Sequence, residues 1–443
     1  ALFEITGIEP EPDFTGVSAY LTTIRTVNGS RTMFRGVQSL LPGELIEVEL
    51  GGDQPIVRTI ATRDINEPSV ESSCRDVLSE SVRRHLRTDV PLCAMLSGGL
   101  DSSAICSIAA DELPSLSTYA AGSDERTPQA MAQTDDVEMA GRMASHLGTE
   151  HAAVRLNEQL FVRTWASMVG VLGVPLSTPN ETAIHLICSA MKAAGCSVAL
   201  SGEGADELLG GYESPMASAV AHIQAGNTDP GLFQLTSNAW CPLDIKQQVL
   251  TPAVRADAEG DAHLLAHYRG MAGTCAARTT NAFAAHLQFH RRVNLTGLLG
   301  RLDSASMLAS VEGRVPFADT VVASWAENLP MSERYDDSSA WRTKIALRQA
   351  FATTLPREVV ERPKASFPLP FQEWMGAAAS RLEDMPWIAE VISPEALLLV
   401  GQMPSVHWRL AWPVMNLALW GERWWGSSEV PEMLASGEAP AVA

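Results

Sequence analysis

The sequence predicts an α/β fold: a doubly wound parallel sheet with a helical C-terminal part and a small β-rich N-terminal piece. An apolar run at 90–96 is followed by a turn with two glycines and by an apolar-periodic segment at 103–110. This is the pattern of a buried strand, a sharp turn and a helix. The alternation continues, with strands expected at 116–121, 151–155 and 196–200 and helices at 134–147 and 183–194. Such sheets bind ligands at the carboxyl ends of their strands.

The composition is that of an ordinary globular enzyme. The chain has 443 residues, of which 46% are hydrophobic and 19% charged, enough for a large core and two or three domains. Its apolar runs are short and interrupted, so no membrane span or membrane partner is expected. The seven cysteines form no CxxC pair, and several lie in apolar segments. Reduced core cysteines of this kind predict a cytoplasmic protein.

The charge balance argues against a nucleic-acid partner. The chain has 32 basic and 52 acidic residues, which gives a net charge of −20. Affinity for a nucleic-acid backbone comes mainly from Lys and Arg side chains that neutralise phosphates. We therefore expect no nucleic-acid binding.

Outside the predicted sheet the sequence is less regular. Strand and hairpin signals occur at 20–23, 32–43 and 44–50, and residues 64–68 are typical of a linker. Helices are expected at 281–302 and 319–329. Tryptophans near the C-terminus, at near-helical spacing, indicate packing rather than a cofactor site.

The glycine turn carries the residue types that bind phosphate. It reads Ser97-Gly98-Gly99-Leu100-Asp101-Ser102-Ser103. The glycines let backbone N–H groups approach a ligand, and we expect Ser102 and Ser103 to cap a helix whose N-terminus favours an anion. No lysine precedes the serines as in a Walker loop, so γ-phosphate hydrolysis is not expected. Phosphates would repel Asp101 unless a Mg²⁺ ion lay between them.

A second polar stretch follows the strand expected at 196–200. Residues 201–212 contain three acids within five residues, set among four glycines. Clustered carboxylates at a strand end suit metal coordination and proton transfer. The alternative is an acidic surface loop ahead of a helix.

Together the two stretches resemble a known family. The string at 97–103 resembles the PP-loop of the ATP pyrophosphatases, whose fold is that of the adenine nucleotide alpha hydrolases. With the stretch at 201–212 it resembles the synthetase domain of asparagine synthetase. Segments that agree with the family in the same order lie at 85–91, 301–319, 344–348 and 355–367. The resemblance covers roughly residues 15–425.

The resemblance implies an ATP-dependent ligase. ATP would activate a carboxylic acid as its acyl-adenylate, with release of pyrophosphate, and an amine would then form the amide and release AMP. Asp101 and Asp206 would carry Mg²⁺, Lys364 would neutralise developing negative charge, and Glu203 would accept a proton from the attacking ammonia. The residues implied for ATP binding are Leu96, Ser97, Gly98, Gly99, Asp101, Ser102, Ser103 and Gly202.

Glu203 bears on the substrate. Relatives that close β-lactam rings carry tyrosine at this position, and lasso-peptide cyclases have a degenerate glycine loop. Glu203 therefore favours synthesis of asparagine from aspartate. A specialised amide ligase or cyclase, and a non-catalytic scaffold, remain as alternatives. Leu209 stands where the family usually has phenylalanine, and Ala365-Ser366 where it more often has glycine, as in a divergent member.

The resemblance also implies a domain organisation. Residues 1–65 resemble the tail of an N-terminal glutaminase-like domain, 69–426 the synthetase domain and 427–443 a flexible tail. The family's glutaminase nucleophile is a cysteine at residue one, whereas here residue 1 is alanine and the first cysteine is Cys74. Glutamine hydrolysis is therefore not assigned, and the glutaminase half is expected to be missing, degenerate or separate. The expected partners are a small carboxylic acid and an amine, and a homodimer is left open.

Overall fold

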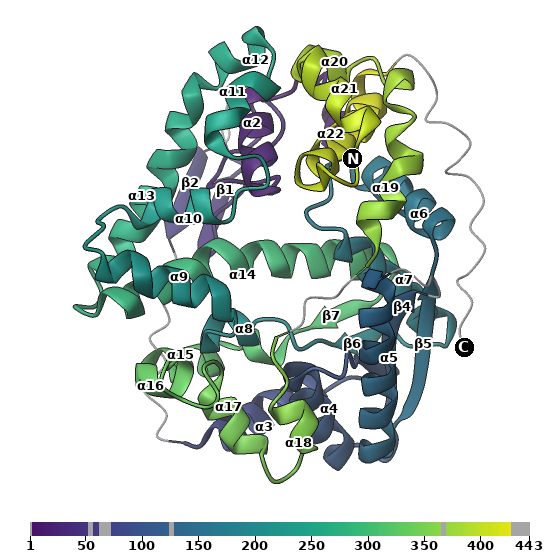
Figure 1. Cartoon of the computed structure of the whole chain (residues 1–443), viewed down its shortest axis with the longest axis vertical. Helices are drawn as coiled ribbons and strands as arrows, with labels where there is room; N and C mark the ends of the chain where they lie inside the picture. The colour runs from purple at the N-terminus through teal and green to yellow at the C-terminus, as the bar shows by residue number, and fades with distance from the viewer. Residues whose placement is uncertain (1, 52–55, 62–71, 124–127, 365–368, 427–443) are drawn as a thin grey trace.

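The chain folds around a parallel sheet of five strands in the order β5-β4-β3-β6-β7 (Figure 1). The computed structural model describes residues 2–51, 56–61, 72–123, 128–364 and 369–426. The strands are β3 (Leu92–Met95), β4 (Ser117–Ser123), β5 (Glu150–Leu156), β6 (Val198–Leu200) and β7 (Glu312–Arg314). The predicted fold class is confirmed.

The strand order reverses beside β3. The chain leaves β3 through α4 (Leu100–Glu112) toward β4 and β5, and later returns to add β6 on the other side of β3, with Cys93 opposite Ala199. The crevice at the carboxyl ends of β3 and β6 is thus a topological switch point, where open α/β sheets bind ligands. The glycine turn follows β3 and the acidic loop follows β6, so both predicted motifs reach this crevice.

Helices cover both faces of the sheet, as the alternation of side chains along β3 requires. Ala94 packs into one hydrophobic core and Cys93 into the other. The first core includes α3 (Cys74–His85), α4, part of α5 (Pro128–Leu147), α8 (Ala205–Leu209), α15 (Thr320–Asn328), α17 (Ile345–Phe351) and α18 (Arg357–Val360). The second includes α2 (Phe14–Thr23), α6 (Glu158–Leu172), α7 (Asn180–Ala193), α19 (Phe371–Ala379), α20 (Ile388–Val391), α21 (Pro394–Gln402) and α22 (Trp408–Trp425).

A long helix, α14 (Ala282–Leu308), crosses the molecule between the sheet and a second group of helices (Figure 1). That group consists of α9 (Glu213–Gln224), α10 (Pro230–Ser237), α11 (Leu243–Val249), α12 (Pro252–Asp257) and α13 (Ala262–Ala276). Short helices occur at α1 (Leu2–Thr6) and α16 (Met331–Arg334), and 3₁₀ turns at Glu259–Asp261, Pro316–Ala318 and Leu382–Asp384. The helices predicted at 281–302 and 319–329 are confirmed as α14 and α15.

The first residues of the N-terminal segment differ from the expectation. The predicted strand at 20–23 is the end of helix α2, and no strand forms over 32–43. Val17, Tyr20 and Leu21 have helical spacing and are fully buried, because α2 packs into the core of the second face. The Tyr20 hydroxyl donates to the carbonyl of Leu176 at 2.5 Å. This part of the segment is therefore integral to the body of the molecule.

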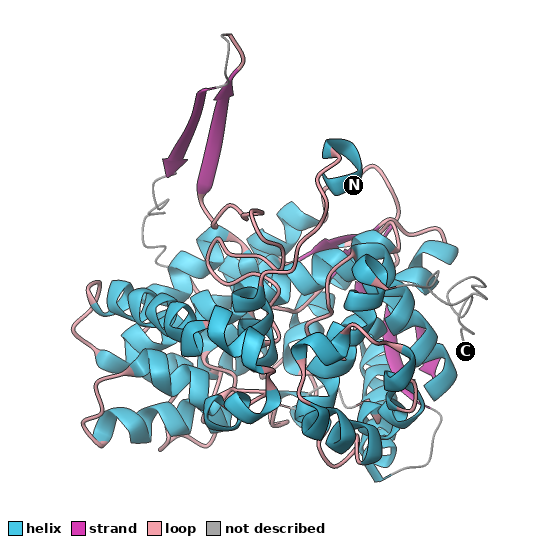
Figure 2. Ribbon diagram, turned by 90° about the horizontal axis from the view of Figure 1, so that it is seen from above, coloured by secondary structure: helices cyan, strands magenta, loops and turns pink. Residues whose placement is uncertain are grey.

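The expected hairpin is present and projects from the body (Figure 2). It consists of the antiparallel strands β1 (Glu44–Glu49) and β2 (Ile56–Ala61). Arg58 on one face pairs with Glu47 and Glu49, both at 3.3 Å. The opposite face carries exposed Ile46, Val48 and Val57. The linker expected at 64–68 and the tail at 427–443 lie outside the described residues.

The C-terminal tryptophans are packing residues. Trp412 and Trp420 are fully buried, and Trp412 stacks on Trp165 with ring centroids 4.6 Å apart. Between them, the amide oxygen of Asn416 accepts from the Trp165 indole at 2.9 Å and from the backbone N–H of Leu176 at 3.0 Å. All seven cysteines are buried and unpaired. Among the described helices, none has the length and apolar character needed to cross a bilayer.

We expect Asn416→Leu to lower the free energy of unfolding by about 2–4 kcal/mol, because two buried donors lose their acceptor. Urea unfolding followed by tryptophan fluorescence measures the change. The matched substitution of the exposed Asn328 to Leu should change stability by no more than about 0.5 kcal/mol. Equal effects of the two substitutions would contradict the role given to the Asn416 amide.

Candidate active site

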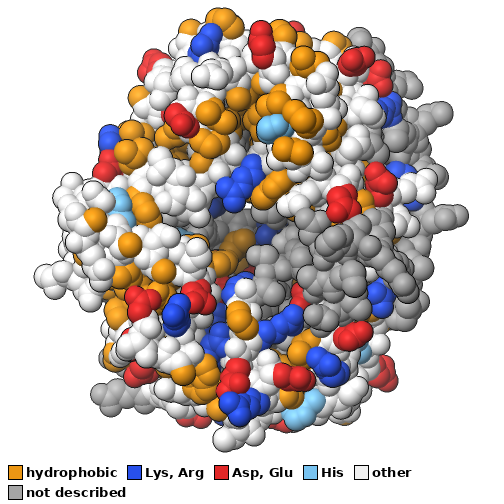
Figure 3. Space-filling model, in the orientation of Figure 1, with side chains coloured by type: hydrophobic (Ala, Val, Ile, Leu, Met, Phe, Trp, Pro, Cys, Tyr) orange, Lys and Arg blue, Asp and Glu red, His pale blue; other side chains and the backbone are white. Residues whose placement is uncertain are grey.

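A cavity of about 390 Å³ lies at the switch point. Its walls come from the glycine turn after β3, the acidic loop after β6, helix α14 and the segment at 344–364. The space-filling view is hollowed near its middle, with Lys and Arg side chains at the rim (Figure 3). Volumes of this size are typical of small-molecule sites.

The glycine turn is held by one serine. The Ser102 hydroxyl accepts from the backbone N–H of Ser97 and donates to the carbonyl of Gly99, both at 3.2 Å. Gly98 has φ +69°, and a Cβ there would lie 2.8 Å from the backbone nitrogen of Ala140. Only glycine fits this position without strain, because the left-handed conformation and the close contact both exclude a side chain.

The prediction that Ser102 and Ser103 cap the helix after the glycine turn is wrong. Helix α4 begins at Leu100 with Gly99 as its N-cap, and no side chain caps it. Ser102 and Ser103 lie inside the first turn, and Ser103 is fully buried. The helix starts earlier than predicted because the chain turns into it directly after the second glycine. The first N–H groups of α4 therefore have no side-chain acceptor.

The acidic loop packs directly on the glycine turn. A Cβ at Gly202 would lie 2.8 Å from the backbone nitrogen of Ser102, so only glycine allows this approach. Gly204 has φ +92° and precedes the short helix α8, in which Asp206 occupies the first turn. The contact brings the carboxylates of Asp101 and Asp206 to one place.

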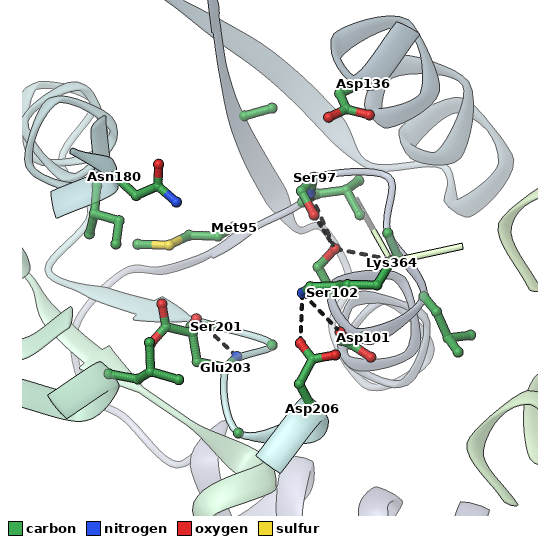
Figure 4. A pocket seen from close by; sticks show the side chains of 18 of the residues that line it. Met95, Ser97, Asp101, Ser102, Asp136, Asn180, Ser201, Glu203, Asp206 and Lys364 are labelled. Atoms are coloured by element: carbon green, nitrogen blue, oxygen red, sulfur yellow. Dashed lines mark hydrogen bonds and ion pairs between the residues drawn. The ribbon is translucent and has the colours of Figure 1, made fainter. Parts of the chain in front are cut away.

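Two lysines meet these two carboxylates. The ammonium nitrogen of Lys344 lies 2.7 and 2.6 Å from the oxygens of Asp101 and 2.5 Å from Asp206. Lys364 Nζ lies 2.6 Å from Asp206 and 3.9 Å from Asp101 (Figure 4). The predicted pair of aspartates therefore shares one cation position, with Lys364 beside it.

The charges stabilise each other strongly. Burial raises the pKa of Asp206, but the ammonium groups of Lys344 and Lys364 outweigh it and lower this pKa to about 2. Burial likewise disfavours charge on Lys364, yet Asp206 and Asp101 raise its pKa above the ordinary value. Asp206 is therefore ionised and Lys364 protonated throughout the neutral range.

Sequence reasoning assigned no role to Lys344. Its backbone is left-handed, with φ +53°, and its N–H donates to the carbonyls of Leu209 and Arg334. A usable signal was the scarcity of lysine, since the chain has only four (192, 246, 344 and 364) among 32 basic residues. Two of these four lie in the site.

Arg348 holds the segment that carries Lys364. One helical turn after Lys344, its guanidinium donates to the carbonyls of Val360 and Arg362. Arg362 in turn pairs with Asp136 of α5, which also lines the cavity. The short helix α17 thus fixes both lysines, Lys344 at its start and Lys364 through Arg348.

Glu203 lies at the other end of the cavity, near Met95 and Asn180 (Figure 4). One carboxylate oxygen accepts from Arg301 of α14 at 2.5 Å, and the other is buried without a hydrogen-bond partner among the described residues. Arg301 also donates to the Thr178 hydroxyl at 3.0 Å. From the sequence, Arg301 is included only as part of segment 301–319, which resembles the family. The ion pair of Arg301 with Glu203 is not predicted from the sequence.

A further buried carboxyl lies beside Asp206. Glu207 is 1% exposed and accepts a hydrogen bond from the Tyr212 hydroxyl at 2.7 Å. Burial, followed by the negative charge of Asp206, raises its pKa to about 7. Glu207 therefore titrates near neutral pH, unlike its neighbour.

Few side chains in the site can bind a metal ion. The part of the chain that the structure describes holds no group of three or more His, Cys, Asp or Glu side chains able to bind an ion. Asp101 and Asp206 do converge on one cation position. Mg²⁺ typically takes one or two carboxylates and completes its shell with phosphate oxygens and water. The residues therefore fit a magnesium ion that arrives with a phosphate ligand.

Most predicted site residues line the cavity, namely Leu96, Ser97, Gly99, Asp101, Ser102, Gly202, Glu203, Asp206 and Lys364. Gly98 and Ser103 lie outside the lining; both are buried. Gly98 shapes the turn, and Ser103 faces the core because it is within α4. Glu207, Arg301, Lys344 and Arg348 line the cavity in addition.

Comparison with known proteins agrees with this geometry. The family model described as asparagine synthase matches residues 73–420. The chain belongs to the asparagine synthase family. The resemblance seen in the sequence is thereby confirmed, and membership supports the expected ATP-dependent ligase.

Three relatives illustrate the range of this family. A Mycobacterium tuberculosis protein provisionally named a glutamine-hydrolyzing asparagine synthetase is 26% identical over 98% of this chain and 71% of its own length. Glutamine-hydrolyzing asparagine synthetase 3 of Bacillus subtilis is 31% identical over 67% of this chain and 48% of its own. Amidase chyE of Penicillium rubens is 23% identical over 80% of this chain and 61% of its own length. The chain therefore spans about half of the Bacillus relative.

We expect Glu207→Gln to stabilise the protein at pH 8 by about 1–3 kcal/mol and to change little at pH 5. The folded pKa of about 7 exceeds the ordinary 4.5. The folded protein holds the proton of Glu207 more tightly than the unfolded chain does. Its free energy of unfolding therefore falls as pH rises from about 4.5 to 7. Glutamine does not ionise and keeps an acceptor for Tyr212. Urea unfolding at both pH values measures the difference.

The control for this experiment is the exposed Glu383→Gln, which should give no pH-dependent gain. A Glu207→Gln variant that is no more stable than wild type at pH 8 would show that Glu207 ionises without cost in the folded protein.

Proposed function

We propose that this chain forms an amide bond at the expense of ATP, through an acyl-adenylate, with release of pyrophosphate and AMP. The observation that carries the proposal is the convergence of Asp101 and Asp206 with two ammonium groups, at the carboxyl ends of neighbouring strands. A carboxylate must attack the α-phosphorus of ATP, so two anions have to meet. Fixed cations and N–H dipoles are what such a step requires.

Each end of the cavity has its own task in this proposal. The uncapped N–H groups of α4 and the turn at 97–99 bind the pyrophosphate portion of ATP. Lys364 and Lys344 stabilise charge on the departing phosphate oxygens. Asp101 and Asp206 would hold Mg²⁺, which when bound neutralises phosphate charge. Because both carboxylates already share a cation, the metal would need no rearrangement of the backbone.

We assign Glu203 to the second half of the reaction. Glu203 lines the cavity near Met95 and Asn180, at the end away from the glycine turn, where the amine would enter. Arg301 holds one of its oxygens and so fixes the carboxylate that would accept the proton released when the amine attacks the acyl group. General bases need this kind of fixed geometry.

We propose aspartate as the carboxylic acid and asparagine as the product. The names of the bacterial relatives support this choice. The second candidate is a specialised amide ligase with another acid; the relative from Penicillium rubens is named an amidase and not an asparagine synthetase. Both candidates use the same phosphate chemistry and differ only in what contacts the Glu203 end of the cavity.

Exchange of labelled pyrophosphate into ATP, measured with a panel of carboxylic acids and no amine, tests the function. We expect exchange with aspartate; exchange with another acid alone would select the specialised ligase, and exchange with no acid would contradict the proposal. Lys364→Met and Asp206→Asn should each lower the exchange rate by about a hundredfold or more. The surface variant Lys192→Met is the matched control and should retain the rate. Melting temperatures confirm that the variants fold.

We also propose that residues 1–65 are the end of a glutaminase-like domain and 69–426 the synthetase domain, with α2 of the first packed into the core of the second. The exposed apolar face of the β1–β2 hairpin supports this, because a two-stranded ribbon is marginal in water without a covering layer. A glutamine-hydrolysing half, of the kind named in the bacterial relatives, would cover this face.

The domain proposal predicts the nitrogen donor. With the purified 443-residue chain, amide formation should depend on ammonium and not on glutamine. Mass spectrometry of the product with ¹⁵N-ammonium or amide-labelled glutamine measures the source. Equal incorporation from glutamine would mean that the chain hydrolyses glutamine itself, and the assignment of residues 1–65 would be wrong.

A further inference from the structure

We propose that the Lys344 ammonium occupies the position that a metal bound by Asp101 and Asp206 would take, so that these carboxylates take up a divalent ion only together with a nucleotide. The inference rests on the proposed use of Mg²⁺ and ATP and concerns the order in which they are bound. In this inference the Lys344 ammonium pairs with the two aspartates until the phosphates of a nucleotide bind it instead.

The first argument is spatial. The Lys344 ammonium lies between both carboxylates, 2.5–2.7 Å from three of their oxygens. A magnesium ion bound by the same oxygens would sit about 2.1 Å from each. The two cations cannot share this space, so the metal can enter only after the ammonium has moved.

The second argument is electrostatic. Asp101 and Asp206 carry two formal negative charges, and Lys344 and Lys364 carry two positive ones. The cluster is therefore formally neutral, and Lys344 is 4% exposed at its side chain. A bare divalent ion would have to displace a buried ammonium that pairs with no other carboxylate in the part of the chain that the structure describes. The phosphates of a nucleotide supply that new partner.

The third argument is the number of ligands. Within the described ranges no third His, Cys, Asp or Glu side chain joins the two aspartates to form a metal group. The affinity of such a site depends on the count of charged ligands. Two carboxylates that are already neutralised make a weak site, and phosphate oxygens complete it.

The backbone of Lys344 is held in place, and a glycine makes room for its side chain. The N–H of Lys344 is bonded to Leu209 and Arg334, at 3.2 and 2.8 Å. Its stem runs across Gly211, where a Cβ would lie 2.2 Å from Lys344 Cε and 2.0 Å from an Asp206 oxygen. Glycine thus leaves a channel for the stem. Lysine suits this task because its ammonium is a compact charge on a flexible chain, unlike the wide fork of arginine.

The test is Mn²⁺ binding to the full chain, measured as loss of the electron paramagnetic resonance signal of free Mn²⁺. Without nucleotide we expect no saturable binding to wild type up to about 1 mM, as for a site with few charged ligands. Lys344→Met should bind Mn²⁺ at least about tenfold more tightly than wild type. With α,β-methylene-ATP present, wild type should bind Mn²⁺ saturably.

Lys364→Met is the matched control. It removes the same unit charge but leaves the ammonium of Lys344 between the carboxylates, so its gain in Mn²⁺ affinity should be clearly smaller. Lys192→Met, on the surface, should show no gain. A merely structural role of Lys344 would not raise metal affinity in its variant.

Two results would overturn the inference. One is saturable Mn²⁺ binding to nucleotide-free wild type that Asp206→Asn removes, a measurement that holds even if Lys344→Met does not fold. The other is an equal gain in Lys344→Met and Lys364→Met, because net charge alone would then govern the metal. Failure of the proposed function looks different: the nucleotide analogue would not bind to wild type with or without metal.

Discussion

The structure of the site depends on two carboxylates held close together, Asp206 buried and Asp101 partly buried. Asp101 and Asp206 come from loops after different strands, and they meet because glycine at position 202 lets the loops touch. Like charges this close would destabilise the fold unless cations were packed with them. Lys344 and Lys364 supply these cations, and α17 and Arg348 keep both lysines in place. Removing either lysine leaves these carboxylates with one cation fewer.

The parallel sheet sets up this arrangement and the helices complete it. The strand order puts the ends of β3 and β6 side by side, so that two motifs about 100 residues apart become neighbours. Helix α14 then adds Arg301 at the far end of the same cavity. One compartment therefore has two ammonium groups at one end and the Glu203–Arg301 pair at the other. A reaction that first activates an acid and then admits an amine needs both ends.

The sequence predicted four of the five strands of the sheet because these are short, mainly apolar runs, which is a local signal; it missed β7, whose sequence Glu-Gly-Arg is polar. It predicted Asp101, Asp206, Glu203 and Lys364 because these lie in recognisable strings. It did not predict Lys344 and Arg301 as site residues, since each reaches the cavity through long-range packing that no local pattern encodes. The strand expected at 20–23 failed for the same reason: α2 is helical because its apolar face is buried against distant tryptophans. Helix α6, between predicted elements, was also missed, although Asn157 caps its start.

The ion pairs of Lys364 have a consequence for chemical selectivity. An activated acyl group reacts with any nearby amine that has a free lone pair. The aspartates raise the pKa of Lys364, so this nitrogen stays an ammonium and has no lone pair to offer. In the proposed reaction, Lys364 would therefore set a positive charge against the phosphate without offering a nucleophile to the activated acyl group. The ion pairs that hold Lys364 in place would in this way also protect it from acylation.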